Sequence, residues 1–429
     1  MQYQLEQSQW WKPEEIQTQQ FRQLEHVIDH AYQTVPYYQD SFKSAGFLPG
    51  KCSLREAWSQ LPILKREEIQ QAGDALVSDS IPEQHGKTFT IWTSGSTGRP
   101  INVMGTGLTR HFWQAFTLRE QLWHDRDLSK RLAVIRYYAD DKAPAPDGVS
   151  TQVWGPATGQ VYDTGPCEIL SLASTIEEQV TWLCKHDPEY LLTFPSNLQA
   201  LVTYFIEHGM TLSKLRGVST LSEALGPNLR DTVRKAWDVE LQDMYSIQEA
   251  GYLALQCPQH EHYHVQAENV LLEILNDKGQ ECKPGEVGRV VITTLHNFAT
   301  PLVRYEVGDY AEVGAPCPCG RGLPVINKIL GRFRNMIVLP SGEQFWPVLG
   351  YKQIEDIIDV RQFQAIQHSS EQIEMKLVVN GEVSEAQEQQ LIAVIQKSLG
   401  YTFQIRFTYV NEIPRSKSGK YEEFISHTV

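Results

Sequence analysis

The octet TSGSTGRP, Thr93 to Pro100, is the most informative stretch of the chain, and the four residues FTIW, Phe89 to Trp92, lead into it. A β-compatible run that passes into hydroxyl residues and glycines predicts a strand ending in a tight loop. Glycines let backbone amides approach an anion closely, and hydroxyl groups add donors. The stretch therefore predicts a phosphate-binding loop. Its candidate donors are Thr93, Ser94, Gly95, Ser96, Thr97 and Gly98.

Two common phosphate motifs do not fit this loop. A Walker motif needs Lys-Ser/Thr after its last glycine, and here Gly98 is followed by Arg99 and Pro100. The dinucleotide fingerprint needs a third glycine that opens a helix. An ordinary Ser/Gly turn stays open as the alternative from the octet alone, so other stretches must decide.

Composition limits the class of protein. A chain of 429 residues has room for two or three domains, and its 41% hydrophobic and 21% charged residues are typical of a soluble globular protein. The net charge of −14 argues against a nucleic-acid surface. The polar N-terminus has no signal-peptide order, and no apolar run approaches the roughly 20 residues of a membrane span. Seven cysteines without a secretion signal indicate reduced thiols, so we expect a cytoplasmic protein, with a homodimer as the assembly to test.

The pattern along the chain predicts an α/β protein with two domains. The first fifty residues have helical spacing, and from Phe89 to about Leu330 short apolar runs alternate with amphipathic segments. Such alternation predicts a large domain with mostly parallel sheets, in which ligands lie beyond the strand ends. The runs at 270–275 and 288–295 predict a hairpin in a β-rich subdomain. Two strand-like runs, a helix over 385–399 and another strand predict a small α+β domain, which gives expected domains of 1–331 and 332–429.

Several separated motifs, in one order, resemble those of the adenylate-forming superfamily, and most closely its phenylacetate:CoA ligase-like branch. TSGSTGRP matches the phosphate-loop signature, and YSIQEAG, Tyr245 to Gly251, resembles the Tyr-Gly-x-Thr-Glu motif. The resemblance implies that Tyr245 stacks on adenine, that Ser246 lies beside the nucleotide and that Glu249 binds Mg²⁺. Ser246 and Gln248 depart from the glycine and threonine of the family pattern.

Three further motifs extend the resemblance. RYEVGD, Arg304 to Asp309, is similar to the Arg-Thr-Gly-Asp motif, which implies that Asp309 accepts hydrogen bonds from the ribose hydroxyls; Glu306 and Val307 depart from that pattern. GRFRNMI resembles the hinge motif, which places Arg332 near the nucleotide and the hinge at Arg334. PRSKSGK resembles the C-terminal motif whose last lysine, here Lys420, bridges the carboxylate and the α-phosphate. Ser222 and Glu223, from LSEAL, match a segment beside adenine and the acyl pocket.

The resemblance implies an AMP-forming acid–thiol ligase. It would use ATP and Mg²⁺ to convert a carboxylic acid, aromatic as in the branch, to an acyl-AMP, and would then pass the acyl group to CoA. Tyr137 and Phe194 are candidates for the acyl pocket. One alternative is transfer to a carrier-protein phosphopantetheine, an amine or a partner reductase. Another is a catalytically inactive nucleotide-binding protein, which the departures at 246, 248, 306 and 307 would suit.

Cysteines and histidines raise a separate question about a metal. Cys257 and His264, from CPQHEHYH, could join Cys317 and Cys319, from CPCG, as the four ligands of a structural Zn²⁺. His260 and His262 compete with His264 as the histidine ligand. Thiols that merely cluster in the sequence are the alternative.

Overall fold

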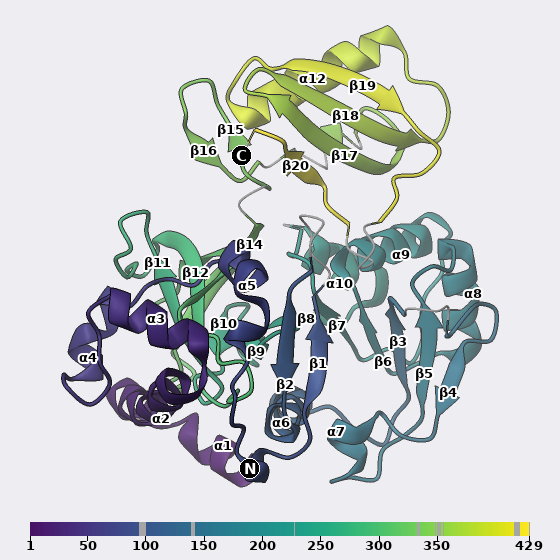
Figure 1. The fold of residues 1–429 in the computed structure, drawn as a ribbon. Coiled ribbons are helices and arrows are strands. Elements are labelled where there is room, and N and C mark those ends of the chain that lie inside the picture. Colours follow the sequence, from purple (N-terminus) through teal and green to yellow (C-terminus); the bar gives the residue numbers. More distant parts are fainter. Residues whose placement is uncertain are drawn as a thin grey trace. The chain divides into compact units, whose positions relative to one another are not determined.

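The computed structural model describes residues 1–93, 100–138, 142–226, 228–332, 335–347, 349, 353–354, 356–415 and 421–428. Their contacts divide the chain into two compact units, Met1–Ile329 and Leu330–Val429 (Figure 1). The sequence-based limits of 1–331 and 332–429 stay a prediction, because the expected hinge residue, Arg334, lies outside the described residues.

The helices follow the amphipathic segments of the sequence. In the N-terminal unit they are α1 (Gln2–Ser8), α2 (Pro13–Thr34), α3 (Pro36–Ser44), α4 (Leu54–Ala57), α5 (Arg66–Ala72), α6 (Gly107–Trp123), α7 (Pro156–Gly159), α8 (Ile176–His186), α9 (Pro195–Glu207) and α10 (Leu229–Trp237), with short 3₁₀ turns at Trp58–Gln60, Gly73–Leu76 and Glu83–His85. The C-terminal unit contributes α12 (Glu385–Leu399), whose bounds are those predicted.

Local signals explain where these helices begin and end. The Thr175 hydroxyl accepts from the Glu178 N–H at 3.2 Å, and the Glu178 carboxylate accepts from the Thr175 N–H at 2.8 Å, which together cap the start of α8. Ser384 caps α12 in the same way, and Gly400 ends that helix in the left-handed conformation, with φ of +65°.

In the described part of the chain, the strands form one large sheet, one four-stranded sheet and two two-stranded ladders. The strands are β1 (Phe89–Trp92), β2 (Asn102–Gly105), β3 (Leu132–Arg136), β4 (Val149–Thr151), β5 (Cys167–Ser171), β6 (Tyr190–Thr193), β7 (Gly217–Leu221), β8 (Glu240–Ile247), β9 (Gly251–Gln256), β10 (Tyr263–Val265), β11 (Val270–Leu275), β12 (Val287–Thr294), β13 (Tyr305–Val313), β14 (Val325–Arg332), β15 (Ile337–Val338), β16 (Gln344–Phe345), β17 (Val360–Ser369), β18 (Gln372–Val379), β19 (Gln404–Tyr409) and β20 (Phe424–Ser426). The large sheet has the order β11-β12-β13-β14-β10-β9-β8-β7-β6-β3-β5-β4.

The large sheet is parallel in one half and antiparallel in the other. Strands β5, β3, β6, β7 and β8 pair in parallel, as the alternation of strands and helices predicted. From β8 onward the pairing turns antiparallel, and β11 and β12 form the predicted hairpin. The strand that leads into the phosphate loop is not part of this sheet, because β1 pairs with β2 in an antiparallel ladder of its own.

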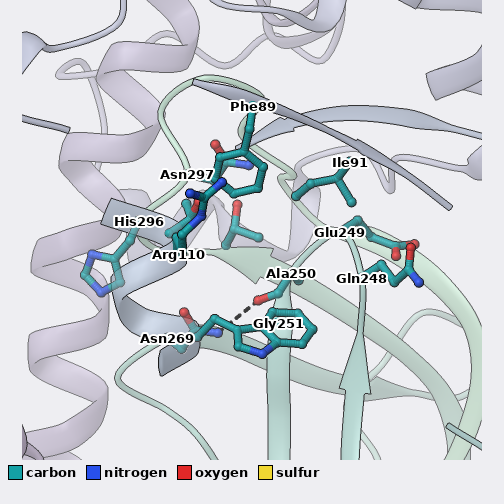
Figure 2. Close-up of a pocket in the computed structure, with 13 residues that line it drawn as sticks. Phe89, Ile91, Arg110, Gln248, Glu249, Ala250, Gly251, Asn269, His296 and Asn297 are labelled. Atoms are coloured by element: carbon teal, nitrogen blue, oxygen red, sulfur yellow. Dashed lines mark hydrogen bonds between the residues drawn. The ribbon is translucent and has the colours of Figure 1, made fainter. Parts of the chain in front are cut away.

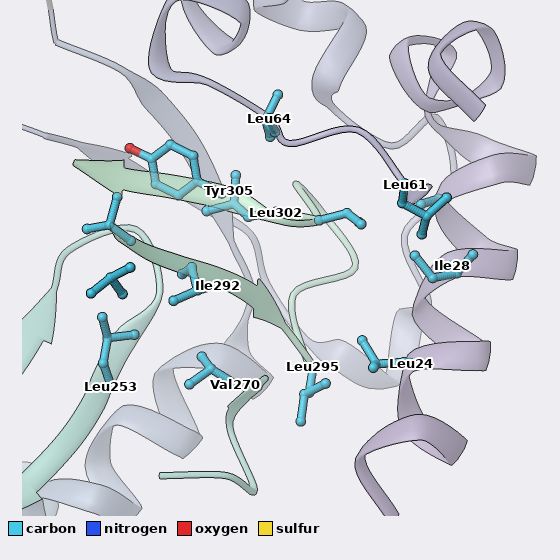
Figure 3. Packing of buried hydrophobic residues seen from close by; sticks show 14 of the residues in the cluster. Leu24, Ile28, Leu61, Leu64, Leu253, Val270, Ile292, Leu295, Leu302 and Tyr305 are labelled. Carbon is cyan, nitrogen blue, oxygen red and sulfur yellow. The ribbon is translucent and has the colours of Figure 1, made fainter. Parts of the chain in front are cut away.

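Among the described residues, the two largest hydrophobic cores pack against the two halves of the large sheet. Helices α8, α9 and α10 bury leucine, valine and aromatic side chains against the parallel strands. The antiparallel half packs against the N-terminal helices, where Leu24 and Ile28 of α2 join Ile292 and Leu302 (Figure 3). The spacing of apolar residues along α2 produces this contact, since residues four apart share one helix face.

The C-terminal unit is a small α+β domain with its own core. Its described sheet has the order β19-β18-β17-β20, with β17 and β18 antiparallel and the two outer strands added in parallel. Leu391, Ile395 and Leu399 of α12 pack on Phe363 and Met375 of the sheet. Among the helices described in either unit, none is both long and apolar enough to cross a membrane.

Candidate active site

The predicted nucleotide and acyl residues follow the ends of neighbouring parallel strands. Tyr137 follows β3, Phe194 follows β6 and Ser222 follows β7, while Tyr245 and Ser246 lie near the end of β8. Because the carboxyl ends of parallel strands meet at one edge of a sheet, these side chains share one edge. Tyr137 is 46% exposed and Phe194 is buried, so only the tyrosine presents its ring to solvent.

The predicted adenine and ribose residues meet directly. The Tyr245 hydroxyl on β8 donates to Asp309 Oδ2 on β13 at 2.8 Å. These residues lie 64 positions apart in the chain, and the sheet order brings their strands into one sheet. A carboxylate has further acceptor sites beyond the one that this tyrosine uses. This acceptor chemistry is the kind that recognises a diol.

The predicted metal carboxylate is buried and held by a second tyrosine. Glu249 lies in the turn between β8 and β9 and is 8% exposed. Its Oε1 accepts a hydrogen bond from the hydroxyl of the fully buried Tyr305 at 3.2 Å. Burial and the Glu249 charge raise the pKa of Tyr305, so this hydroxyl stays protonated and donates. Oxygen atoms, carboxylate oxygens among them, are the ligands that Mg²⁺ prefers, so the Glu249 carboxylate is of the type that could contribute one ligand to that ion.

The base of the phosphate loop is closed by a backbone bridge. The Thr93 N–H donates to the Ile101 carbonyl at 3.1 Å, and the Ile101 N–H donates to Thr93 Oγ1 at 3.2 Å. The remaining loop residues of the prediction, Ser94, Gly95, Ser96, Thr97 and Gly98, lie outside the described residues.

The other predicted residues have contacts of their own or lie outside the described residues. Glu223 Oε2 accepts from the Ser196 N–H at 3.0 Å, in the first turn of α9, where a carboxylate complements the helix N-terminus. Ser222 adopts a left-handed conformation with φ of +74°. Arg332 ends β14 and belongs to the C-terminal unit. Arg334 and Lys420 lie outside the described residues.

A cavity of about 310 Å³ lies beside Glu249. Figure 2 shows side chains from β1, α6 and the β8–β9 turn facing it. Much of the lining is apolar, and the Asn269 amide fixes one wall by donating to the Ala250 carbonyl at 3.0 Å. The full lining is Phe89, Ile91, Thr109, Arg110, Trp113, Gln248, Glu249, Ala250, Gly251, Asn269, Thr294, His296 and Asn297. Tyr137 and Phe194, the residues predicted for the acyl pocket, are not among the described residues that line it.

The cavity has an uneven distribution of charge. Glu249 lies on one side, while the Arg110 guanidinium stacks on the Phe89 ring at 4.3 Å, where its charge faces the aromatic π-system. Burial lowers the pKa of His296 to about 4, so this ring is neutral at pH 7. Its Nε2 lies 2.8 Å from the Glu268 carbonyl, which can only accept, so Nε2 carries the proton.

Three cysteines and one histidine converge at the ends of β9 and β10. The ligand atoms of Cys257, His264, Cys317 and Cys319 all lie within 4.8 Å of one another. Cys257 Sγ is 3.8 Å from Cys317 Sγ, and Cys319 Sγ is 3.4 Å from His264 Nε2. Of the three histidines weighed from the sequence, His264 is the one in this described cluster.

The surroundings of this cluster suit thiolate ligands. Backbone N–H groups of Gln259 and Cys319 point at Cys257 Sγ and Cys317 Sγ at 3.5 Å and 3.4 Å. Arg321 donates to Cys319 Sγ at 3.6 Å. Three sulfurs and one imidazole nitrogen match the tetrahedral ligand set of structural zinc.

Sequence reasoning missed two residues of the site. Arg66, in helix α5, received no role in the sequence analysis, and it donates from Nη2 to Thr93 Oγ1 at 3.0 Å. Tyr305 lies inside RYEVGD, but only Asp309 of that motif received a role. The four-residue spacing from Tyr305 to Asp309 carried no signal of the contact to Glu249, because that contact joins segments 56 positions apart in the chain.

The chain is similar to several known proteins. The family model described as the CapK C-terminal domain matches residues 350–427. A phenylacetate-coenzyme A ligase of Thermus thermophilus is 23% identical over 95% of both chains, and protein CapK of Staphylococcus aureus is 21% identical over 95% of this chain and 87% of its own. A crystal structure of 2-hydroxyisobutyryl-CoA ligase with 2-HIB-AMP superposes with a TM-score of 0.75 and 17% identity, covering 95% of this chain and 88% of that one. That structural likeness bears on the fold.

Proposed function

We propose that the chain, which is similar over nearly its whole length to phenylacetate-coenzyme A ligases, is a member of the adenylate-forming superfamily in its phenylacetate-CoA ligase-like branch, and that it activates a carboxylic acid with ATP and transfers the acyl group to CoA. The observation that carries the proposal is the convergence of three parts at one site. The closed base of the phosphate loop, the Tyr245–Asp309 pair and the Tyr305–Glu249 pair come from distant segments. These are the parts that the binding of a nucleoside triphosphate requires.

In the first step, a carboxylate oxygen of the acid attacks the α-phosphorus of ATP and pyrophosphate leaves. Asp309 would accept the ribose hydroxyls, and Tyr245 would face the base. Glu249 would hold Mg²⁺, which supplies charge neutralisation to the phosphates. Lys420 and the loop donors from Ser94 to Gly98, whose roles come from the family resemblance, would offset the developing charge. In the second step the CoA thiolate attacks the acyl carbonyl and AMP leaves.

The acid is proposed to lie in the cavity beside Glu249. Its walls include two aromatic rings, Phe89 and Trp113, and a volume of about 310 Å³ lies within the range of small-ligand pockets. These features favour an aryl acid. Tyr137 and Phe194 stay as the competing prediction. Trp113→Ala and Tyr137→Ala should be compared across a panel of acids, and the variant that changes the order of preference identifies the acyl wall.

We also propose a structural Zn²⁺ at Cys257, His264, Cys317 and Cys319. The ligand set has no vacant position for chemistry, so the ion would join β9 and β10 to the segment before β14 rather than take part in the reaction.

ATP–pyrophosphate exchange tests the first step. The panel should hold phenylacetate, benzoate, anthranilate, hydroxybenzoates, 2-hydroxyisobutyrate and a fatty acid. We expect exchange with at least one aryl acid. Lys420→Ala should abolish exchange and leave thioester formation from supplied acyl-AMP largely intact, and Lys417→Ala is the matched control from the same segment. Equal loss of both half-reactions in Lys420→Ala would contradict the role given to this lysine.

The same assay separates the alternatives. Exchange without CoA thioester, followed by turnover when a carrier protein or an amine is added, would favour a different acceptor. Folded protein that binds ATP but exchanges with no acid on the panel would favour the inactive nucleotide-binding protein.

A further inference from the structure

The hydroxyl of Thr93, at the base of the phosphate loop, is held from two sides. The Ile101 N–H donates to it at 3.2 Å from beyond the loop, and Arg66 Nη2 donates to it at 3.0 Å from helix α5. Thr93 is only 6% exposed, so its bond to Ile101 is buried, while its bond to Arg66 is partly buried. A displacement of Arg66 would therefore disturb Thr93, the residue at which the loop begins.

The segment that leads into helix α5 is hydrogen-bonded to the segment around Tyr305. The Leu64 N–H donates to the Arg304 carbonyl at 3.0 Å, and the Glu306 N–H donates to the Leu64 carbonyl at 2.9 Å. These bonds make a parallel bridge between Leu64 and Tyr305. Arg66 begins its helix two residues after this bridge, so its backbone is fixed relative to β13.

Tyr305 continues the contacts to the carboxylate. Its ring is fully buried, and its hydroxyl donates to Glu249 Oε1 at 3.2 Å. The Arg66 charge also acts on this hydroxyl, and it opposes the rise in pKa that burial and Glu249 cause. One cation thus acts on two polar groups, the Thr93 hydroxyl at the loop base and the Tyr305 hydroxyl that holds Glu249.

We propose that Arg66 is a positioning residue that ties the phosphate-loop base, through Thr93, to the Glu249 carboxylate, through Tyr305. The inference rests on the proposed function, since it concerns the β- and γ-phosphates of ATP and the cation that would bridge them. Arg66 suits this position because a planar guanidinium presents several donors in a fixed fork and stays charged. The series of contacts Thr93–Arg66–Tyr305–Glu249 thereby fixes the position of the loop base relative to the Glu249 carboxylate.

This arrangement predicts a split between the two half-reactions. The adenylation step uses ATP, with all three phosphates, whereas acyl-AMP carries only one phosphate. Arg66→Met should lower ATP–pyrophosphate exchange by about 10- to 100-fold, in the range of a lost positioning contact. Thioester formation from supplied acyl-AMP should change less than about twofold, which is our limit for a contact that this step does not use.

Calorimetric binding gives a readout besides activity. For Arg66→Met we expect the Kd of MgATP to rise by about tenfold, as one lost charge-assisted bond would cause, and the Kd of AMP to stay as in the wild type. Tyr305→Phe keeps the buried ring and removes its hydroxyl, and should weaken MgATP binding more than ATP binding in EDTA. Arg66→Lys keeps the charge without the fork and should restore part of the loss. Arg55→Met, an exposed arginine in the same N-terminal region, is the control and should behave as wild type.

A double-mutant cycle decides the connection. If Arg66 acts through Tyr305, the effects of Arg66→Met and Tyr305→Phe on MgATP affinity will not add. Additive effects, or an equal loss of both half-reactions in Arg66→Met, would overturn the proposal. Should Arg66→Met not fold, Arg66→Lys with Tyr305→Phe makes the same cycle. If wild type catalyses exchange and the Arg66 variant does so equally well, this inference is refuted and the proposed function stands. If wild type binds MgATP but adenylates no acid, the proposed function is refuted, and the MgATP binding test of Arg66 still applies.

Discussion

Replacement of Arg304 by methionine should destabilise the N-terminal unit severely. The Arg304 side chain is 2% exposed, and Glu273, its ion-pair partner, is 5% exposed. Arg304 Nη2 donates to Glu273 Oε1 at 3.0 Å and Nε donates to Oε2 at 3.3 Å, while Nη1 donates to the carbonyls of Ser59 at 3.1 Å and Leu61 at 2.6 Å. The guanidinium thus joins the β13 segment to the β11 strand and to the N-terminal segment in one network.

The magnitude follows from what the substitution leaves behind. Removal of one partner of a buried ion pair costs about 3–5 kcal/mol. Each of the two carbonyls that loses its donor adds about 1 kcal/mol where water does not replace it. Protonation of Glu273, whose pKa burial already raises despite Arg304, limits the sum. We expect a loss of about 4–6 kcal/mol in the free energy of unfolding at pH 7.

The pH dependence has a defined sign. Without Arg304, the pKa of Glu273 in the folded state rises further above its value in the unfolded state. The loss of stability therefore begins as the pH rises through the unfolded-state pKa and grows until the pH reaches the folded-state pKa. The deficit of Arg304→Met should therefore shrink when unfolding is measured at acid pH.

Urea unfolding followed by tryptophan fluorescence measures this loss. The control is Arg304→Met combined with Glu273→Leu, because replacement of a buried ion pair by apolar groups is often neutral. The double variant should recover most of the stability. A loss below about 1 kcal/mol in Arg304→Met, the size of an exposed pair, would refute the reasoning, as would a double variant no more stable than the single one.

Three further substitutions test other parts of the structure. Burial lowers the pKa of His296 to about 4, so the folded protein loses stability as the pH falls from about 6.5 toward that value. Between pH 7 and pH 5, urea unfolding should show that wild type loses up to about 2 kcal/mol more than His296→Gln. Equal losses in the two proteins would contradict the shift. Cys317→Ser should reduce the zinc content measured by mass spectrometry and lower the melting temperature, and wild-type protein purified without bound metal would contradict the zinc proposal. In Gly322→Ala the new Cβ would overlap the Trp11 carbonyl oxygen, so the N-terminal segment must move. We expect a cost of about 1–3 kcal/mol in stability and faster proteolysis near Trp11, and unchanged proteolysis would count against this packing.

Local chemistry in the sequence was sufficient for much of the fold. The alternation of apolar runs and amphipathic segments predicted the parallel strands β3, β6 and β7 with the helices between them, because the period of side chains differs between strand and helix. The caps at Thr175 and Ser384 are also local interactions, but the sequence analysis did not predict them. The motifs also named Tyr245 and Asp309, which the sheet brings to within 2.8 Å of each other.

Other features depended on tertiary structure. No local signal could show that β1 pairs with β2 in a separate ladder rather than in the large sheet. Nor could one show that the parallel half of that sheet continues into an antiparallel half, since register and pairing depend on which faces are buried together. Arg66 had the sequence context of an exposed helix, and only the bridge from Leu64 to β13 places it beside Thr93 and Tyr305.

The sequence by itself determined the types of chemistry available, because glycines, hydroxyls, carboxylates and thiols have fixed properties wherever they occur. Only the tertiary structure decided which of them meet. Cys257 and Cys317 are 60 positions apart, and Glu249 and Tyr305 are 56 apart, yet both pairs are in contact. Contacts at such separations follow from the burial of whole sheet faces, which is a property of the folded chain and of no single segment.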